Sequence, residues 1–125
     1  EREHTATGGS SLGGLIALYL GFMATETFGR LLVMSPSLWW DRRSLLQHVR
    51  AGVEKLPLRV WLDVGTGEGG GTLQNARMLK NALLRRGWIG GDDFRYVEAA
   101  GADHTESAWA ARAGAALEFL FRHGD

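Results

Sequence analysis

Short apolar runs and helical patterns alternate along the chain, and this alternation limits the possible folds more than any other feature. The apolar runs have the length of buried strands, and the segments between them place apolar residues at helical spacing. The expected strands cover residues 4–9, 30–34, 58–64 and 94–99, and the expected helices cover residues 11–27, 42–51, 72–86 and 105–122. The order is therefore β-α-β-α-β-α-β-α.

Strands that alternate with helices over short connections form a parallel sheet with helices on both faces. The sequence therefore predicts an α/β fold with three layers, built from four β-α units, in which right-handed crossovers make consecutive strands neighbours. We expect residues 1–125 to form one unit. The ligand site of such a sheet lies beyond the carboxyl ends of its strands, so the loops that follow the strands are the places to search.

The composition excludes several classes of partner. Fourteen basic residues balance 14 acidic ones, so no basic field attracts nucleic acid or an anionic membrane surface. No residue is a cysteine, which excludes a disulfide framework and cysteine-rich zinc sites and leaves the cellular compartment open. The longest apolar stretch, residues 12–23, is interrupted by glycines and is shorter than a membrane span.

The loop after the first expected strand reads Gly9-Ser10-Ser11-Leu12-Gly13, which matches G-x-S-x-G between a strand and a helix. Such a turn holds a serine hydroxyl clear of the sheet. We expect glycine at positions 9 and 13, on either side of the serine, because a side chain at Gly9 or Gly13 would collide with the neighbouring strand or helix. The start of the helix leaves the amide N–H of Leu12 able to bind an oxyanion. Ser11 is the candidate nucleophile and Leu12 the candidate oxyanion-hole donor. The alternative is that Ser10 or Ser11 only caps the helix.

A serine hydroxyl becomes a useful nucleophile only when a base takes its proton. His104 follows the fourth expected strand and precedes the last helix, which is the place of the base in the chain order serine, acid, histidine. His48 lies in a polar helix, His4 precedes the first strand, and His123 lies at the C-terminus. We therefore expect His104 to be the base.

The acid that orients such a histidine is expected after the third strand, and Glu68 is the candidate there. Asp63 is a rival, but its position within the strand tends to bury it beside the sheet. Asp103, next to His104, is a weaker rival. Glu106 fits better in the first turn of the last helix, where negative charge is favourable.

Four segments in order resemble the Putative esterase family, which includes esterase D, the enterobactin-type siderophore esterases and the feruloyl esterases. They are Gly9-Ser10-Ser11-Leu12-Gly13-Gly14, Ser35-Pro36-Ser37-Leu38-Trp39-Trp40, residues 62–68, and Gly101-Ala102-Asp103-His104 with Trp109. The resemblance implies the C-terminal half of an α/β-hydrolase fold. It also implies ester hydrolysis through an acyl-enzyme, with Ser11 as nucleophile, His104 as base and Glu68 as acid, and with no metal or organic cofactor. Some siderophore esterases are thought to use a Ser–His dyad, so the acid is the member left open.

The Ser-Leu-Trp-Trp loop is similar to that of the siderophore esterase branch. This similarity implies a small-molecule ester as the substrate, with siderophore-type or aryl esters as the first class to test. Trp39 and Trp40 follow a strand's carboxyl end, so we expect them in the substrate pocket. Trp61 is expected in the core and Trp88 on the surface, and Trp109 is expected to pack against the sheet and steady the histidine loop.

Members of the family are longer than this chain, and their N-terminal half supplies a strand beside the strand that precedes the nucleophile. It also supplies the second oxyanion N–H. We therefore expect residues 4–8 to form an apolar edge strand whose partner is the absent N-terminal half. The alternative function is a catalytically incomplete fragment or an interaction module, and acyl transfer to an alcohol would use the same residues.

A second glycine pattern suggests a different function. Gly65-Thr66-Gly67-Glu68-Gly69-Gly70 matches the dinucleotide-binding pattern G-x-G-x-x-G after a strand and before a helix. Against this interpretation, Glu68 would place a carboxylate where a pyrophosphate should bind. The acidic residue expected after the next strand is also absent, since Asp92 and Asp93 precede that strand. A dinucleotide-binding domain is therefore the lesser alternative.

Overall fold

The computed structural model describes residues 1–122 and has the expected order of strands and helices. The strands are β1 (Ala6–Ser10), β2 (Arg30–Met34), β3 (Arg59–Gly65) and β4 (Phe94–Ala99). The helices are α1 (Leu12–Met23), α2 (Trp40–Ala51), α3 (Thr72–Arg86) and α4 (Glu106–Phe121), preceded by a single 3-10 turn, η1 (Arg2–His4). The first strand begins later than expected because η1 takes up His4. In α2 the helical geometry is interrupted at residues 41–43, which have positive φ.

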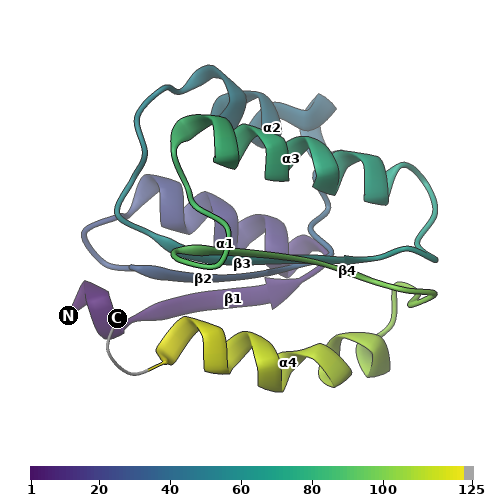
Figure 1. Cartoon of the computed structure of the whole chain (residues 1–125). Helices are drawn as coiled ribbons and strands as arrows, with labels where there is room; N and C mark the ends of the chain where they lie inside the picture. The colour runs from purple at the N-terminus through teal and green to yellow at the C-terminus, as the bar shows by residue number, and fades with distance from the viewer. Residues whose placement is uncertain (123–125) are drawn as a thin grey trace.

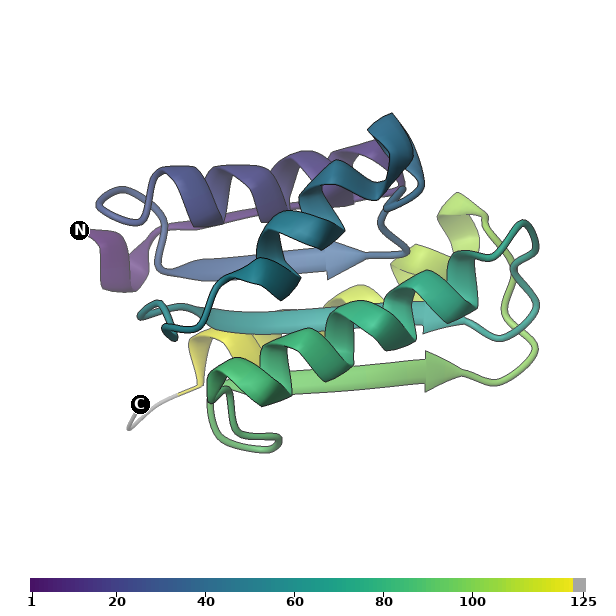
Figure 2. The same cartoon turned by 90° about the horizontal axis from the view of Figure 1, so that it is seen from above.

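The four strands form one parallel sheet in the order β1-β2-β3-β4, so consecutive strands are neighbours as predicted. Figure 1 shows α1, α2 and α3 on one face of the sheet and α4 on the other. In Figure 2 the strands point the same way, and α2 runs obliquely above the sheet between α1 and α3. The expected three layers are therefore present, and the loops at the carboxyl ends of the strands share one edge.

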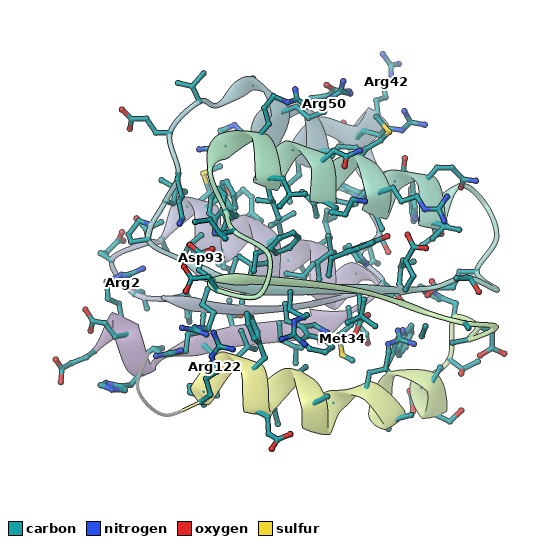
Figure 3. All side chains as sticks on the ribbon, viewed as in Figure 1. Arg2, Met34, Arg42, Arg50, Asp93 and Arg122 are labelled. Carbon is teal, nitrogen blue, oxygen red and sulfur yellow. The ribbon has the colours of Figure 1, made fainter. Side chains whose placement is uncertain are left out.

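Both faces of the sheet are covered, and alternation along β3 divides its residues between two cores. Val60 and Leu62 belong to the larger core beneath α1, α2 and α3, whereas Trp61 belongs to a smaller core with Phe119 and Leu120 of α4. Figure 3 shows Met34 in the layer between the sheet and α4. Trp61 is thus a core residue, as expected.

The expectation that Trp88 lies on the surface is wrong. Only 2% of Trp88 is exposed, its Nε1 donates to the Leu58 carbonyl oxygen at 2.9 Å, and its ring centroid lies 6.0 Å from that of Phe22. The reason is the turn at Gly87, which has φ 112° and closes α3 with a left-handed cap. This cap reverses the chain and directs the next side chain into the larger core.

β1 lies at an edge of the sheet within residues 1–122, as expected from the sequence. It pairs with β2 from Ala6 opposite Arg30 to Ser10 opposite Met34. An edge strand presents backbone donors and acceptors to any further strand. Within the same residues, no helix has the length and apolarity that crossing a membrane requires.

The glycines around Ser11 are only partly as expected. A Cβ at Gly9 would lie 2.7 Å from the backbone of Gly13, so the expected collision exists there. At Gly13 the expectation is wrong, because a Cβ would meet nothing within 4 Å. The tight contact is at Gly14 instead, where a Cβ would lie 2.8 Å from the carbonyl oxygen of Met34. Gly14 is the helical position that faces β2, which lets α1 pack closely on the sheet.

This difference predicts opposite effects for two adjacent substitutions. Gly13→Ala is expected to raise the free energy of unfolding by about 0.4–1 kcal/mol, because alanine restricts the unfolded chain more than glycine does. Gly14→Ala is expected to lower it by about 1–3 kcal/mol through overpacking against β2. Urea unfolding followed by circular dichroism measures both values. Equal effects of the two substitutions would contradict the packing described here.

Candidate active site

Ser11 is the single residue between the end of β1 and the start of α1, and it has an unusual backbone conformation. Its φ is 59° and its ψ is −122°, which is strained for a residue with a side chain. Its amide N–H donates to the Met34 carbonyl oxygen at 3.0 Å, and its own carbonyl oxygen accepts from the amides of Leu15 and Ser37, both at 3.1 Å. These backbone contacts hold the turn in place and leave the side chain directed into the edge where the strands end.

The Ser11 hydroxyl lies between two polar groups from distant loops. The Nε2 atom of His104 is 2.9 Å from the Ser11 Oγ, and the Ser37 Oγ is 3.2 Å from it. The structure therefore brings together the serine and the histidine that the sequence singled out, across 93 positions of the chain. Ser37 was not expected here, although its place directly after the strand next to β1 was a signal that it lies near Ser11.

His104 bridges the exposed part of the site and its buried part. Its Nδ1 lies 2.6 Å from the Oε1 of Glu68. The side chain of His104 is 42% exposed, whereas that of Glu68 is 1% exposed. The ring of Trp109 meets the imidazole edge-on, with centroids 4.8 Å apart and planes at 87°. Trp109 thus contacts the histidine directly, in line with the expectation that it steadies this loop.

The rival carboxylates have other partners. Asp63 is fully buried, and its two oxygens accept from Arg112 Nη2 at 3.0 Å and from Trp61 Nε1 at 2.8 Å. Asp103 accepts from the Thr105 hydroxyl at 2.7 Å. Of the three candidate acids, Glu68 is thus the one whose contact with His104 the structure records.

The rival histidines lie elsewhere. His4 is exposed in η1, and His48 is on α2 beside a surface cavity. His123 lies outside the described residues. Glu106 is in the first turn of α4, as expected.

A buried polar cluster lies behind Glu68, and sequence reasoning missed two of its members, Ser35 and Arg112. The Ser35 hydroxyl is 2.5 Å from the Oε2 of Glu68, and both Trp109 Nε1 and Arg112 Nη2 donate to that hydroxyl, at 3.0 and 3.3 Å. Arg112 was detectable in principle, because it follows Trp109 by three positions on the face of α4 that turns to the sheet. A charged residue on the buried face of a helix needs a partner inside the protein, so its position indicates a buried polar cluster.

The glycine-rich loop after β3 has a local explanation. A Cβ at Gly65 would overlap the carbonyl oxygen of Ala102, because the loop that carries His104 lies directly against it. The amide N–H of Gly65 donates to the Oε2 of Glu68 at 2.7 Å, so this carboxylate turns into the protein. A Cβ at Gly67 would also lie close to the Ala102 carbonyl oxygen, at 2.9 Å, and Gly70 has a positive φ of 66°. Packing and backbone conformation thus account for the three glycines of the dinucleotide pattern without a pyrophosphate.

A surface cavity of about 690 Å³ lies between α1 and α2. Its lining is mainly apolar and includes Leu12 and Trp40 at one end, with Ile16, Tyr19 and Met23 further along α1. Leu12 is the first residue of α1, so its amide N–H has no acceptor within the helix. Trp39 and Trp40 are 55% and 51% exposed, and of the two it is Trp40 that lines the cavity.

Across residues 1–122, no three histidine, aspartate or glutamate side chains gather in a way that could hold a metal ion. His104, which contacts Ser11, is hydrogen-bonded through its other ring nitrogen to Glu68. The chemistry that this arrangement supports is proton transfer from a serine hydroxyl to an imidazole.

A parallel α/β sheet with a serine on a strained strand-to-helix turn, hydrogen-bonded to a histidine, is the architecture of the α/β-hydrolase class. Comparison with known proteins identifies the family. Residues 1–120 match the family model described as Putative esterase. The chain belongs to this esterase family.

Individual relatives agree with this assignment. Iron(III) enterobactin esterase of Escherichia coli is 40% identical over an alignment of 73 positions that covers 53% of this chain and 18% of that protein. The crystal structure of enterochelin esterase from Shigella flexneri is 27% identical, with a TM-score of 0.84 over 98% of this chain and 32% of that one. A ferulic acid esterase at 19% identity shares the fold, with a TM-score of 0.78 over 98% of this chain and 52% of its own. The chain thus spans about half or less of the proteins that it matches.

Proposed function

We propose that this chain carries the reacting residues of a serine carboxylic-ester hydrolase. Ser11 is the nucleophile, His104 the base and Glu68 the acid that orients the base. The observation that carries the proposal is one continuous chain of hydrogen bonds, from Ser11 Oγ to His104 Nε2 at 2.9 Å and from His104 Nδ1 to Glu68 Oε1 at 2.6 Å. Hydroxyl, imidazole and carboxylate in this order activate a serine for attack on a carbonyl.

The acylation step follows from the roles of these atoms. The Nε2 of His104 takes the hydroxyl proton as the Ser11 oxygen attacks the ester carbonyl carbon. Glu68 accepts the Nδ1–H and stabilises the imidazolium that forms. His104 then gives the proton to the leaving alcohol, and the acyl group remains on Ser11. Water attacks this acyl-enzyme with the same proton transfers in reverse, which releases the acid and restores the serine.

The tetrahedral intermediate carries a negative oxygen that needs hydrogen-bond donors. The amide N–H of Leu12 is the donor that this chain offers, because it is at the start of α1 and next to Ser11. We propose that the second donor comes from an N-terminal segment that this chain does not contain, and that this segment adds a strand to the outer edge of β1. Loss of one such donor typically slows catalysis by about 100- to 1000-fold.

The substrate we propose is a small ester that carries an aromatic ring, of the siderophore or aryl type. The relatives named above act, by their names, on enterobactin and ferulic acid esters. The cavity that starts at Leu12 and Trp40 is apolar and large enough for an aromatic ring. Trp40 offers such a ring a stacking surface, and Trp39, which precedes it in the chain, is also more than half exposed.

A specific observation also supports the alternative that the chain alone is a catalytically incomplete part of an esterase. β1 is an edge strand and Leu12 supplies one donor, so the chain would hold the reacting residues without the complete oxyanion hole. Acyl transfer to an alcohol uses the same residues. The dinucleotide-binding alternative loses its main argument, since packing against Ala102 accounts for Gly65 and Gly67 and a positive φ accounts for Gly70.

Steady-state hydrolysis of a catechol or nitrophenyl ester tests the roles of the residues. Ser11→Ala and His104→Ala are expected to abolish turnover, and Glu68→Gln to lower kcat by about 10,000- to 30,000-fold, the loss seen when an orienting carboxylate is removed. Asp103→Asn is the matched control, since this neighbouring carboxylate contacts Thr105 and not the imidazole, and it should keep its kcat. Equal losses in the two acid variants would contradict the role of Glu68. No turnover by the folded, unmodified chain would favour the incomplete-site alternative.

The aromatic preference predicts a selective effect at Trp40. Trp40→Ala is expected to lower kcat/KM for a benzoate or catecholate ester by about 2- to 10-fold and to leave that for an acetate ester nearly unchanged, because stacking is worth about 0.5–1.5 kcal/mol. Trp61→Phe, in the core and away from this loop, is the control for general loss of packing. A parallel fall for both esters would show that Trp40 has a structural role and does not recognise the acyl group.

A further inference from the structure

Ser35, the residue that follows β2, occupies a conformation that serine does not favour. Its φ is 41°, it is fully buried, and its amide N–H donates to the Asp63 carbonyl oxygen at 2.9 Å. A glycine would adopt this conformation at lower cost. A non-glycine residue that is strained and buried next to a candidate active site suggests that its side chain serves the site.

The hydrogen-bond partners fix the direction of the Ser35 proton. Trp109 Nε1 at 3.0 Å and Arg112 Nη2 at 3.3 Å are groups that only donate, so the Ser35 oxygen is the acceptor in both contacts. The single proton of Ser35 is therefore left to donate to Glu68 Oε2, which is 2.5 Å away. The Ser35 hydroxyl thus links Trp109 and Arg112 to the Glu68 carboxylate: it accepts hydrogen bonds from the first two and donates one to the carboxylate.

This link controls the rotation of the Glu68 carboxylate. The terminal torsion of a glutamate has broad preferences, so external contacts must set it. Oε2 accepts from Ser35 and from the Gly65 amide at 2.7 Å, and this leaves Oε1 facing His104 Nδ1 at 2.6 Å. If the Ser35 hydroxyl is removed, the Gly65 amide is the remaining recorded contact of Oε2, and the carboxylate can turn away from the imidazole.

The far end of the link is anchored in the core between β3 and α4. Arg112 and Asp63 form an ion pair at 3.0 Å, with their side chains 8% and 0% exposed. Trp61 Nε1 holds the second oxygen of Asp63 at 2.8 Å. The Nε and Nη1 of Arg112 have no acceptor within residues 1–122, so Asp63 and Ser35 are the groups that fix its guanidinium.

We infer that Ser35 is a positioning residue that connects the buried Arg112–Asp63 ion pair to Glu68 and keeps the carboxylate directed at His104. This inference rests on the proposed function, because it assigns Ser35 a part in activating Ser11. It adds a residue that acts on the carboxylate from inside the protein and touches neither Ser11 nor the substrate.

Two Ser35 variants separate the hydroxyl from the backbone. Ser35→Ala removes the hydroxyl and keeps the strained backbone, whereas Ser35→Gly removes the hydroxyl and relieves the strain. Trp61→Phe is the matched control, since it removes one hydrogen bond of the same cluster without touching Glu68. Both Ser35 variants are expected to lower kcat by about 10- to 100-fold, the effect of losing one hydrogen bond to a charged group, with KM unchanged. Trp61→Phe is expected to keep its kcat.

The His104 Nδ1 proton provides a readout that does not require turnover. A proton in a short hydrogen bond to a carboxylate gives a strongly downfield NMR signal. The signal is assigned to His104 if it is absent from the spectrum of His104→Ala. The signal is expected to move upfield in both Ser35 variants and to stay in place in Trp61→Phe. If the unmodified chain hydrolyses no ester, that result favours the incomplete-site alternative, and this signal still decides whether Ser35 positions Glu68.

Three results would overturn the inference. An unmoved signal in both Ser35 variants would show that Glu68 holds its place without the hydroxyl. A shift in Ser35→Ala alone would attribute the effect to backbone strain. An equal shift in Trp61→Phe would attribute it to general loosening of the cluster.

Discussion

The positive φ of Ser11 is the constraint on which the rest of the site depends. A side chain in this conformation costs free energy, and the structure meets that cost with backbone hydrogen bonds from Ser11 to Met34, Leu15 and Ser37. The sharp turn between β1 and α1 is what directs the hydroxyl toward His104 and puts the first amide of α1 beside it. The same turn brings α1 so close to the sheet that Gly9 and Gly14 have no room for a side chain. Strain, close packing and hydroxyl orientation are thus three consequences of one local geometry.

The parallel sheet then assembles the site from loops that are distant in sequence. Ser10 is opposite Met34, Met34 opposite Asp63 and Asp63 opposite Val97, so the four strands end at nearly the same level. The residues that follow these strands therefore meet at one edge. Ser11, Ser35, Glu68 and His104 each come from a different loop, and every contact among them spans at least 33 positions of the chain. The hydrophobic cores set this register, and the polar contacts follow from it.

Much of this arrangement was predictable from the sequence, because it depends on periodicity and on the order of loops. The alternation of apolar runs predicts the strand order, and a serine after the first strand and a histidine after the fourth must share an edge in a parallel sheet. Trp88 was misjudged because its place depends on the left-handed turn at Gly87, which reverses the chain after α3. Gly13 was misjudged because the rotation of α1 about its own axis decides which glycine faces β2. The glycine pattern does not fix that rotation, and Gly14 is the residue that faces the strand. Ser35 and the buried partners of Arg112 were missed because the sequence does not reveal which polar groups meet inside the protein.

Membership of the esterase family and the hydrogen-bonded Ser11, His104 and Glu68 together lead to the central claim, that His104 activates Ser11 as a nucleophile. The most direct measurement is the intact mass of the chain after treatment with a fluorophosphonate, a reagent that modifies activated serines. The account predicts a single adduct on the unmodified chain, assigned to Ser11 by peptide mapping, and none on Ser11→Ala or His104→Ala. An adduct on a different serine, or no adduct on a chain that circular dichroism shows to be folded, would contradict it.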